Sequence, residues 1–370
     1  MVVPTITQES ILLSNSCLKS KNLLRVSLFI PPFDYKNYRL FEIFHYEEDR
    51  RVMIAPLAIE KFSLVKNAQD ADWILIPVFI TELLGETGRS LIRTTSEIAK
   101  KLGKPFGLYS NSDFIVDVDV DNAYLFTPGA YQSKPFQINL PATLPEDPYK
   151  KWIGAKWEAF PNSSRPSVGF CGQATTQPLK ILKDLFTFNS TKIKNKLGLT
   201  LSNPGPVFLP AYQRATLLKH FEKDSRFETQ FILRNQYKAG AVSSSQNVQV
   251  EKEFFQNINS NLFTVCMRGM GNYSVRFFQT LAMGRIPILI DTDYEIPFQE
   301  FNQLDLIIPI IPYEKRSEVA DVVYNYFISK TPDELIAIQC KCRGIWKEYY
   351  QKEGLIEYTR KIMCGKGPRL

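Results

Sequence analysis

Residues 261–298, NLFTVCMRGMGNYSVRFFQTLAMGRIPILIDTDYEIPF, decide how the second half of the chain folds. Residues 262–266 form a short apolar run typical of a strand, and the glycines that follow permit a tight turn. Apolar positions recur at helical spacing over residues 275–282, and Gly284 fits the residue that ends a helix. Residues 286–290 are apolar throughout, as in a strand buried on both faces. The stretch therefore predicts a strand, a glycine loop, a helix and a second strand.

The loop and the helix start have the properties of an anion site. A helix N-terminus offers unpaired N–H groups and the positive end of a dipole, and glycines let an anion approach the backbone closely. Arg268 adds a planar guanidinium that suits phosphate oxygens, and Arg276 and Gln279 share a polar helix face. A diphosphate carrying a sugar or ribose is the natural ligand. A well-packed strand–helix–strand unit with solvated polar residues explains the same spacing, and this alternative stays open.

The same stretch resembles the C-terminal signature of the exostosin-like glycosyltransferases, family 47. The matching residues are Arg268, Gly269, Ser274, Arg276, Phe277, Phe278, Leu281, Gly284, Ile286, Pro287, Tyr294, Glu295, Pro297 and Phe298. The resemblance implies an α/β chain of the GT-B type, with two Rossmann-like domains facing across a cleft. It also implies an inverting, metal-independent transferase that uses a nucleotide diphosphate-sugar. The family's acidic residue, expected on the donor's ribose hydroxyls, is Gln279 here, so the charge-assisted hydrogen bond is lost.

Length and charge agree with a two-domain enzyme acting on an anionic substrate. A chain of 370 residues exceeds one ordinary core. The net charge of +7 permits a nucleotide-sugar, an anionic membrane surface or nucleic acid as partner. No nucleic-acid-binding motif occurs, so nucleic acid is not expected.

The expected compartment is the cytoplasm, with peripheral contact to the inner face of the membrane left open. No segment reaches the about 18 consecutive apolar residues that a membrane helix needs, and the first residues lack the pattern of a signal peptide. We expect the six cysteines to be reduced thiols. Cys340 and Cys342, with Cys364, are not expected to bind a metal, because no histidine lies near them and residues i and i+2 of a helix face different ways.

Strands alternate with helices in both halves, which predicts parallel α/β sheets. In the first half we expect strands over residues 25–30, 73–79 and 106–109, an amphipathic helix over 38–48 and a helix over 87–102. The predicted division is an acceptor-side domain over 1–150, a connection over 151–166, a donor domain over 167–352 and a closing helix in 353–370 that returns to the first domain.

Other enzyme classes lack their motifs. The chain has neither a P-loop nor a dinucleotide-binding glycine motif after its first strand. Asp117, Asp119 and Asp121 alternate as on one face of a strand and have the spacing of a D-x-D metal motif. They lack a nucleotide-binding context, so a solvated edge strand is the better interpretation. His45 and His220 are interpreted as surface or core residues. The serines at residues 243–245 are interpreted as a flexible loop, with a lid over the donor as the alternative.

Roles for the site residues follow from the resemblance and from their positions. Arg268 is predicted to bind the diphosphate and Asp113, at the end of a first-half strand, to be the catalytic base. His45 is the alternative base, and a helix N-cap or Asx-turn is the alternative role for Asp113. The predicted donor-binding residues are Gly269, Gly271, Asn272, Tyr273, Ser274, Arg276, Gln279, Asp293 and Glu295, with no cofactor and no metal. The acceptor is expected to be a glycan or a lipid-linked glycan. A catalytically idle relative that binds a glycan or acts as a scaffold is the alternative function, supported by Gln279.

Overall fold

The computed structural model describes residues 25–154, 156–161, 163–236, 240, 243–299 and 303–365. The expected absence of a signal peptide concerns residues outside these ranges. Within them, no helix combines the length and the apolar character needed to cross a bilayer.

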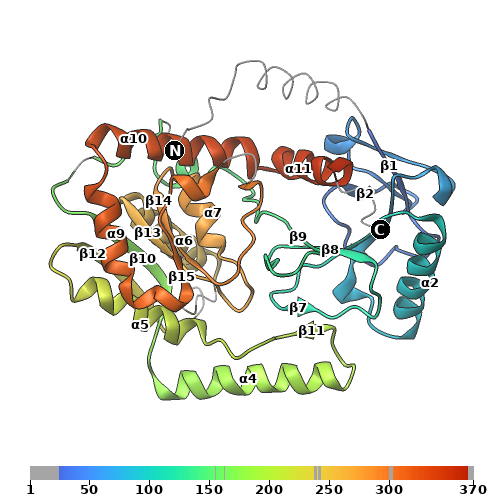
Figure 1. The fold of residues 1–370 in the computed structure, drawn as a ribbon, viewed down its shortest axis with the longest axis horizontal. Helices are drawn as coiled ribbons and strands as arrows, with labels where there is room; N and C mark the ends of the chain where they lie inside the picture. The colour runs from blue at the N-terminus through green and yellow to red at the C-terminus, as the bar shows by residue number, and fades with distance from the viewer. Residues whose placement is uncertain are drawn as a thin grey trace, which may run out of the picture.

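Each half of the chain contains one parallel sheet, as the alternating pattern predicts. The first sheet has the order β4 (Phe62–Leu64), β1 (Val26–Phe29), β5 (Trp73–Phe79), β6 (Phe106–Tyr109), β8 (Ala123–Thr127) and β9 (Gln137–Asn139). The second has the order β12 (Glu228–Arg234), β10 (Ser167–Gln173), β13 (Phe263–Cys266), β14 (Ile286–Asp291) and β15 (Ile310–Pro312). Figure 1 shows the two halves side by side.

In the first sheet β4 lies on one side of β1, and the later strands lie on the other side. In the second sheet β12 lies on one side of β10, and the later strands lie on the other side. This order reverses between β1 and β5 in the first sheet and between β10 and β13 in the second. Ligands of open α/β sheets bind in the crevice at the carboxyl ends of the strands, at such a switch point. The fold therefore directs attention to the loops that follow β10 and β13.

Helices cover the sheets and join the halves. Among the described residues, those of at least eight residues are α2 (Glu86–Leu102), α4 (Pro178–Lys196), α5 (Pro210–Glu222), α6 (Ser244–Asn259), α7 (Val275–Ala282), α9 (Val319–Ile328), α10 (Pro332–Tyr349) and α11 (Lys352–Gly365). The short α3 (Pro148–Trp152) lies between the sheets in sequence. Apolar side chains of α11 are buried in the first core, and the Trp73 indole donates to the Met363 carbonyl at 2.9 Å. The closing helix thus returns to the first half.

The carboxyl ends of the two sheets face each other. Tyr131, which follows β8, pairs with Tyr294, which follows β14. A two-stranded antiparallel ladder joins β7 (Ile115–Val116) in the first half to β11 (Ser202–Asn203) in the second. Two Rossmann-like domains facing across a hollow form the GT-B architecture that the resemblance implies.

Three local predictions are wrong. Residues 38–48 contain no helix, because β2 (Phe44–Tyr46) pairs there with β3 (Val52–Ile54) as a hairpin, so His45 lies on a strand. The serines at 243–245 begin α6 instead of forming a loop, since Ser243 caps the helix with Gln246 in a capping box. No strand contains Asp117 and Asp119, because β7 ends at Val116.

Candidate functional site

The loop at residues 267–274, between β13 and α7, is fixed at the switch point by Asn272. This side chain is 2% exposed. Its Oδ1 accepts from Thr292 Oγ1 at 2.7 Å, and its Nδ2 donates to the carbonyl oxygens of Asp293 (3.2 Å) and Ala130 (3.5 Å). Because Ala130 belongs to the first half, Asn272 holds the loop against both halves. This task differs from its predicted contact with a donor, which stays untested.

Arg268 follows β13 and organises the loop. Its Nη2 donates to the Met270 carbonyl at 2.9 Å, its Nε to the Gly271 carbonyl at 3.2 Å, and its Nη1 to the Tyr131 hydroxyl at 3.3 Å. The guanidinium carbon lies 4.7 Å from the centre of the Phe208 ring. All of these partners are neutral, so the positive charge of Arg268 keeps its attraction for an anion.

Arg276, the second residue of α7, reaches back to the carboxyl end of β10. Its Nη2 donates to the Cys171 carbonyl at 3.0 Å, and its guanidinium carbon lies 4.2 Å from the centre of the Phe170 ring. A Cβ at Gly172 would come within 2.5 Å of that Nη2. Glycine at 172 thus makes room for the guanidinium between β10 and α7.

Arg214 on α5 is a third guanidinium at this edge. Its Nη2 donates to the carbonyl oxygens of Arg268 (2.8 Å) and Met267 (3.2 Å), and its Nη1 to that of Gln173 (3.4 Å). It therefore joins the end of β10 to the start of the loop.

This edge of the second sheet is electrostatically unbalanced. Among the described residues, neither Arg214 nor Arg268 nor Arg276 forms an ion pair with a carboxylate. Burial, and then the nearby Arg276, lowers the pKa of Arg214, and burial lowers that of Arg276. The N-cap residue Ser274 is buried, and its side chain does not cap α7. Guanidinium groups at the positive end of a helix dipole destabilise the unliganded fold, and an anion there would relieve that penalty.

Asp113 approaches the glycine loop from the first half. The Asp113 side chain is exposed, and its Oδ1 accepts from the Tyr273 hydroxyl at 3.0 Å. A Cβ at Gly271 would come within 2.6 Å of the Asp113 carbonyl oxygen, so this glycine allows the close approach. No helix follows Asp113, and the Phe114 N–H bonds instead to Ser112 Oγ at 3.1 Å. The alternative role as a helix N-cap therefore lacks its helix.

A hollow between the two halves separates Asp113 from Arg268. It is lined by Ser112, Asp113, Phe114, Ile115, Leu125, Thr127, Gly129, Tyr131, Gln137, Pro204, Arg268, Met270 and Asn272. Both predicted catalytic residues thus reach the same space, although they lie far apart in the sequence.

Two other predicted donor residues have separate settings. The Gly269 N–H donates to the Tyr273 carbonyl at 3.1 Å, so this amide is used inside the loop. Gln279 is half-buried on α7, and within the described part of the chain its side chain makes no hydrogen bond. Its amide is available for a ligand.

Asp293 and Glu295 contribute to the seam between the halves. The Asp293 carboxylate accepts from the Ser133 N–H at 3.2 Å and from the Ser133 hydroxyl. The Glu295 N–H donates to the Ala130 carbonyl at 3.2 Å. The predicted contact of these two residues with the donor is untested, and for Asp293 the observed partner is the first domain.

The C-terminal end of α7 carries a second group of arginines. Arg285 Nη1 donates to the carbonyl oxygens of Gly284 (3.1 Å), Glu158 (3.2 Å) and Met283 (3.4 Å), and its Nε to that of Asn259 (3.1 Å). Burial lowers the pKa of Arg285 to about 10. These carbonyls include the ends of α6 and α7, where a cation is favourable.

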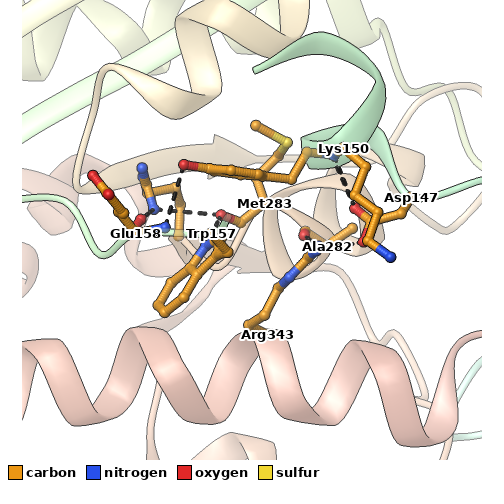
Figure 2. A network of polar contacts seen from close by, with 9 residues as sticks. Asp147, Lys150, Trp157, Glu158, Ala282, Met283 and Arg343 are labelled. Carbon is orange, nitrogen blue, oxygen red and sulfur yellow. Dashed lines mark hydrogen bonds and ion pairs between the residues drawn. The ribbon is translucent and has the colours of Figure 1, made fainter. Parts of the chain in front are cut away.

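Arg343 on α10 completes this second group. It donates to the Ala282 carbonyl at the end of α7 and pairs with Asp147, a network shown in Figure 2. Asp147 also caps α3, because its Oδ1 accepts from the N–H groups of Tyr149 (3.0 Å) and Lys150 (3.4 Å). Here cations meet helix carbonyls and a carboxylate, so the arrangement is structural.

Sequence reasoning missed Arg214, Tyr131 and Phe208. A signal existed for Arg214, because it shares a helix face with Leu217, Leu218 and Phe221, all buried. An arginine on an apolar face indicates a task inside the protein. Tyr131 and Phe208 reach the site through contacts between distant segments, which no local pattern indicates.

In the described part of the chain, no cluster of three or more His, Cys, Asp or Glu side chains has the proximity needed to hold a metal ion. The predicted independence from metals and cofactors remains a prediction.

Comparisons with known proteins leave the family open. No family model and no curated protein sequence matches the chain, so the exostosin resemblance stays a prediction. Among solved structures, a mutant of S. aureus TarM in complex with fondaparinux, alpha-GlcNAc-glycerol and UDP aligns with a TM-score of 0.32 at 10% identity, over 82% of this chain and 51% of that one. A second TarM structure aligns with a TM-score of 0.31 at 12% identity, over 85% of this chain and 59% of that one. The chain thus spans little more than half the length of these proteins, and alignments this weak carry no argument about its activity.

Proposed function

We propose that the chain is a glycosyltransferase that moves a sugar from a nucleoside diphosphate-sugar to a hydroxyl group of a glycan or lipid-linked glycan. One observation carries the proposal: Arg214, Arg268 and Arg276 gather without a carboxylate partner, among the described residues, at the switch point of the second sheet. A nucleoside diphosphate supplies the negative charge that this edge lacks.

The three guanidinium groups have different tasks in this proposal. Arg268 and Arg276, with the first N–H groups of α7, bind the diphosphate and stabilise the charge that grows on it as it leaves. Arg214 holds the loop carbonyls that position Arg268. These cations take the part that a divalent ion plays in other transferases. Gln279 lies one turn further along α7, and its side-chain amide forms a hydrogen bond with a ribose hydroxyl.

Asp113 is the proposed base. Its carboxylate accepts the proton of the acceptor hydroxyl while that oxygen bonds to the anomeric carbon, and the bond from this carbon to the diphosphate oxygen breaks. The electron pair leaves with the diphosphate, and attack from the opposite face inverts the anomeric centre. The Tyr273 hydroxyl holds Asp113 Oδ1 and so leaves Oδ2 to accept the proton.

The proposal is tested by the Asp113→Asn variant. Turnover should fall on the order of 10² to 10⁴, measured as release of nucleoside diphosphate from a panel of UDP- and GDP-sugars with and without glycan acceptors. The melting temperature should not change, because the side chain is exposed and an amide oxygen still accepts from Tyr273.

Full activity in Asp113→Asn would remove this residue as the base. Absence of turnover with every donor, together with measurable glycan binding by the wild-type chain, would replace the proposal with the idle glycan-binding alternative.

A further inference from the structure

Helix α4 leaves the second half after β10, and the chain then returns through β11, which pairs with β7 of the first half. Figure 1 shows α4 along the periphery of the molecule, below both domains in that view. One side of the helix faces inward, where Phe188 is buried and Ile181 and Leu185 are half-buried. The other side faces outward along its whole length.

The outward side carries an apolar stripe. Leu179, Leu182, Phe186 and Ile193 are exposed by 83, 62, 75 and 58%, and Leu197, directly after the helix, by 68%. Their spacings of three, four, seven and four residues place them on one narrow face of the helix. A row of large exposed apolar side chains on one helix face marks a binding surface.

Lysines flank the stripe on both sides. On a helical projection Lys183 and Lys194 lie along one border and Lys196 along the other, and all three are exposed. The one acidic residue of α4, Asp184, is on the inward side, where it pairs with Lys180. The outward face is therefore apolar in its centre and positive at its borders.

The apolar stripe and its flanking lysines together favour one kind of binding partner over another. In a symmetric pair of α4 helices, lysines would face lysines, which disfavours a second copy of the chain. An anionic bilayer surface matches both features, because the apolar side chains enter the boundary between headgroups and acyl chains while the lysines meet lipid phosphates. We propose that the outward face of α4 docks the protein on an anionic lipid surface. The proposal is independent of the catalytic assignment, since none of these residues lines the hollow.

Vesicle co-sedimentation of the full chain tests the docking. Wild-type protein should bind vesicles that contain phosphatidylglycerol, fail to bind vesicles of phosphatidylcholine alone, and dissociate as salt rises. Leu182→Ser with Phe186→Ser should reduce binding at least tenfold. Lys183→Gln and Lys194→Gln should each reduce it about fivefold. The matched control is Leu306→Ser, a leucine 73% exposed outside α4, which should bind as the wild type does.

All these positions are exposed, so the variants should keep the wild-type melting temperature and their activity on a soluble acceptor. Equal binding by wild type and the Leu182→Ser, Phe186→Ser variant, or no binding of phosphatidylglycerol vesicles by the wild type, would overturn the proposal. A wild-type dimer that this double variant converts to monomer in sedimentation velocity would assign the face to a second copy instead.

Discussion

The two ends of α7 both gather arginines, but only the C-terminal end includes an arginine paired with a carboxylate. At the C-terminal end, Arg285 and Arg343 bond to the carbonyls that close the helix, and Asp147 supplies a negative charge. At the N-terminal end, Arg268 and Arg276 face the positive pole of the same helix. The first arrangement is what stability favours.

The second arrangement opposes stability, and this difference separates a structural cluster from a functional one. Buried cations without counter-ions persist where they have another task. Burial lowers the pKa at both ends, for Arg285 as for Arg276, so desolvation alone does not distinguish them. The partners do.

The largest expected effect concerns the structural end. Arg343→Met should lower the free energy of unfolding by about 3–5 kcal/mol, because it leaves Asp147 buried without its cation. The side chains of this pair are 6% and 15% exposed. Urea unfolding measures the change. Arg93→Met is the control, since its pair with Glu86 is 44% and 80% exposed and its loss should cost about 1 kcal/mol or less. Equal losses in both variants would contradict the structural role.

The next effect concerns activity. Arg268→Met should reduce transition-state stabilisation by about 2–4 kcal/mol, or roughly 30- to 900-fold in turnover, because the leaving diphosphate loses its main cation. Release of nucleoside diphosphate under saturating donor measures it. Arg165→Met, at the opposite edge of the second sheet, removes an exposed arginine paired with Glu228 and should leave turnover unchanged. Undiminished turnover in Arg268→Met would contradict the assignment of Arg268 to the diphosphate.

A smaller effect is expected one turn into α7. Gln279→Glu should tighten ribonucleotide binding by about 1–2 kcal/mol if the side chain faces the ribose, because a carboxylate forms a charge-assisted bond. Gln279→Leu is the matched variant without hydrogen-bonding capacity and should weaken it. Calorimetry showing the same affinity for all three side chains would place Gln279 outside the ribose site.

The smallest expected effect is on stability, and it compares Arg276 at the N-terminal end of α7 with Arg285 at the C-terminal end. Arg276→Met should leave the unfolding free energy unchanged or raise it by up to about 1 kcal/mol, because it removes a cation from the positive end of the helix. Arg285→Met should instead destabilise the fold, since four carbonyl oxygens lose their donor. A large loss of stability in Arg276→Met would show that its bond to Cys171 is its main task.

The sequence predicts most of the fold because periodicity reports burial. The strand, loop, helix and strand over residues 261–298 appear as β13, α7 and β14, and Ser274 and Gly284 flank the helix as expected. The failure at residues 38–48 has a physical cause. A short β2–β3 hairpin contains few residues, and its apolar positions also fit a helix.

The candidate site was harder to predict than the fold. Arg268 and Arg276 stand in one local unit, so spacing alone placed them together. The approach of Asp113 to Tyr273 joins residues 160 positions apart. The position of Asp113 after a strand predicted the edge of the sheet at which it lies, but not Tyr273 as its partner. Arg214 reaches the loop because α5 packs beside β10, next to the carbonyls that follow β13, which is a property of the assembled sheet.

Calorimetric titration with UDP and GDP tests the central claim most directly, using the wild type, the double variant Arg268→Met with Arg276→Met, and Arg165→Met as control. The account predicts that at least one of these nucleotides binds the wild type and Arg165→Met equally, with affinity that falls as salt rises. The double variant should lose about 150-fold or more, since each charge-assisted bond contributes about 1.5–3 kcal/mol. Equal affinity in all three proteins, or no binding of either nucleotide by the wild type, would contradict the claim that the N-terminal end of α7 is a diphosphate site.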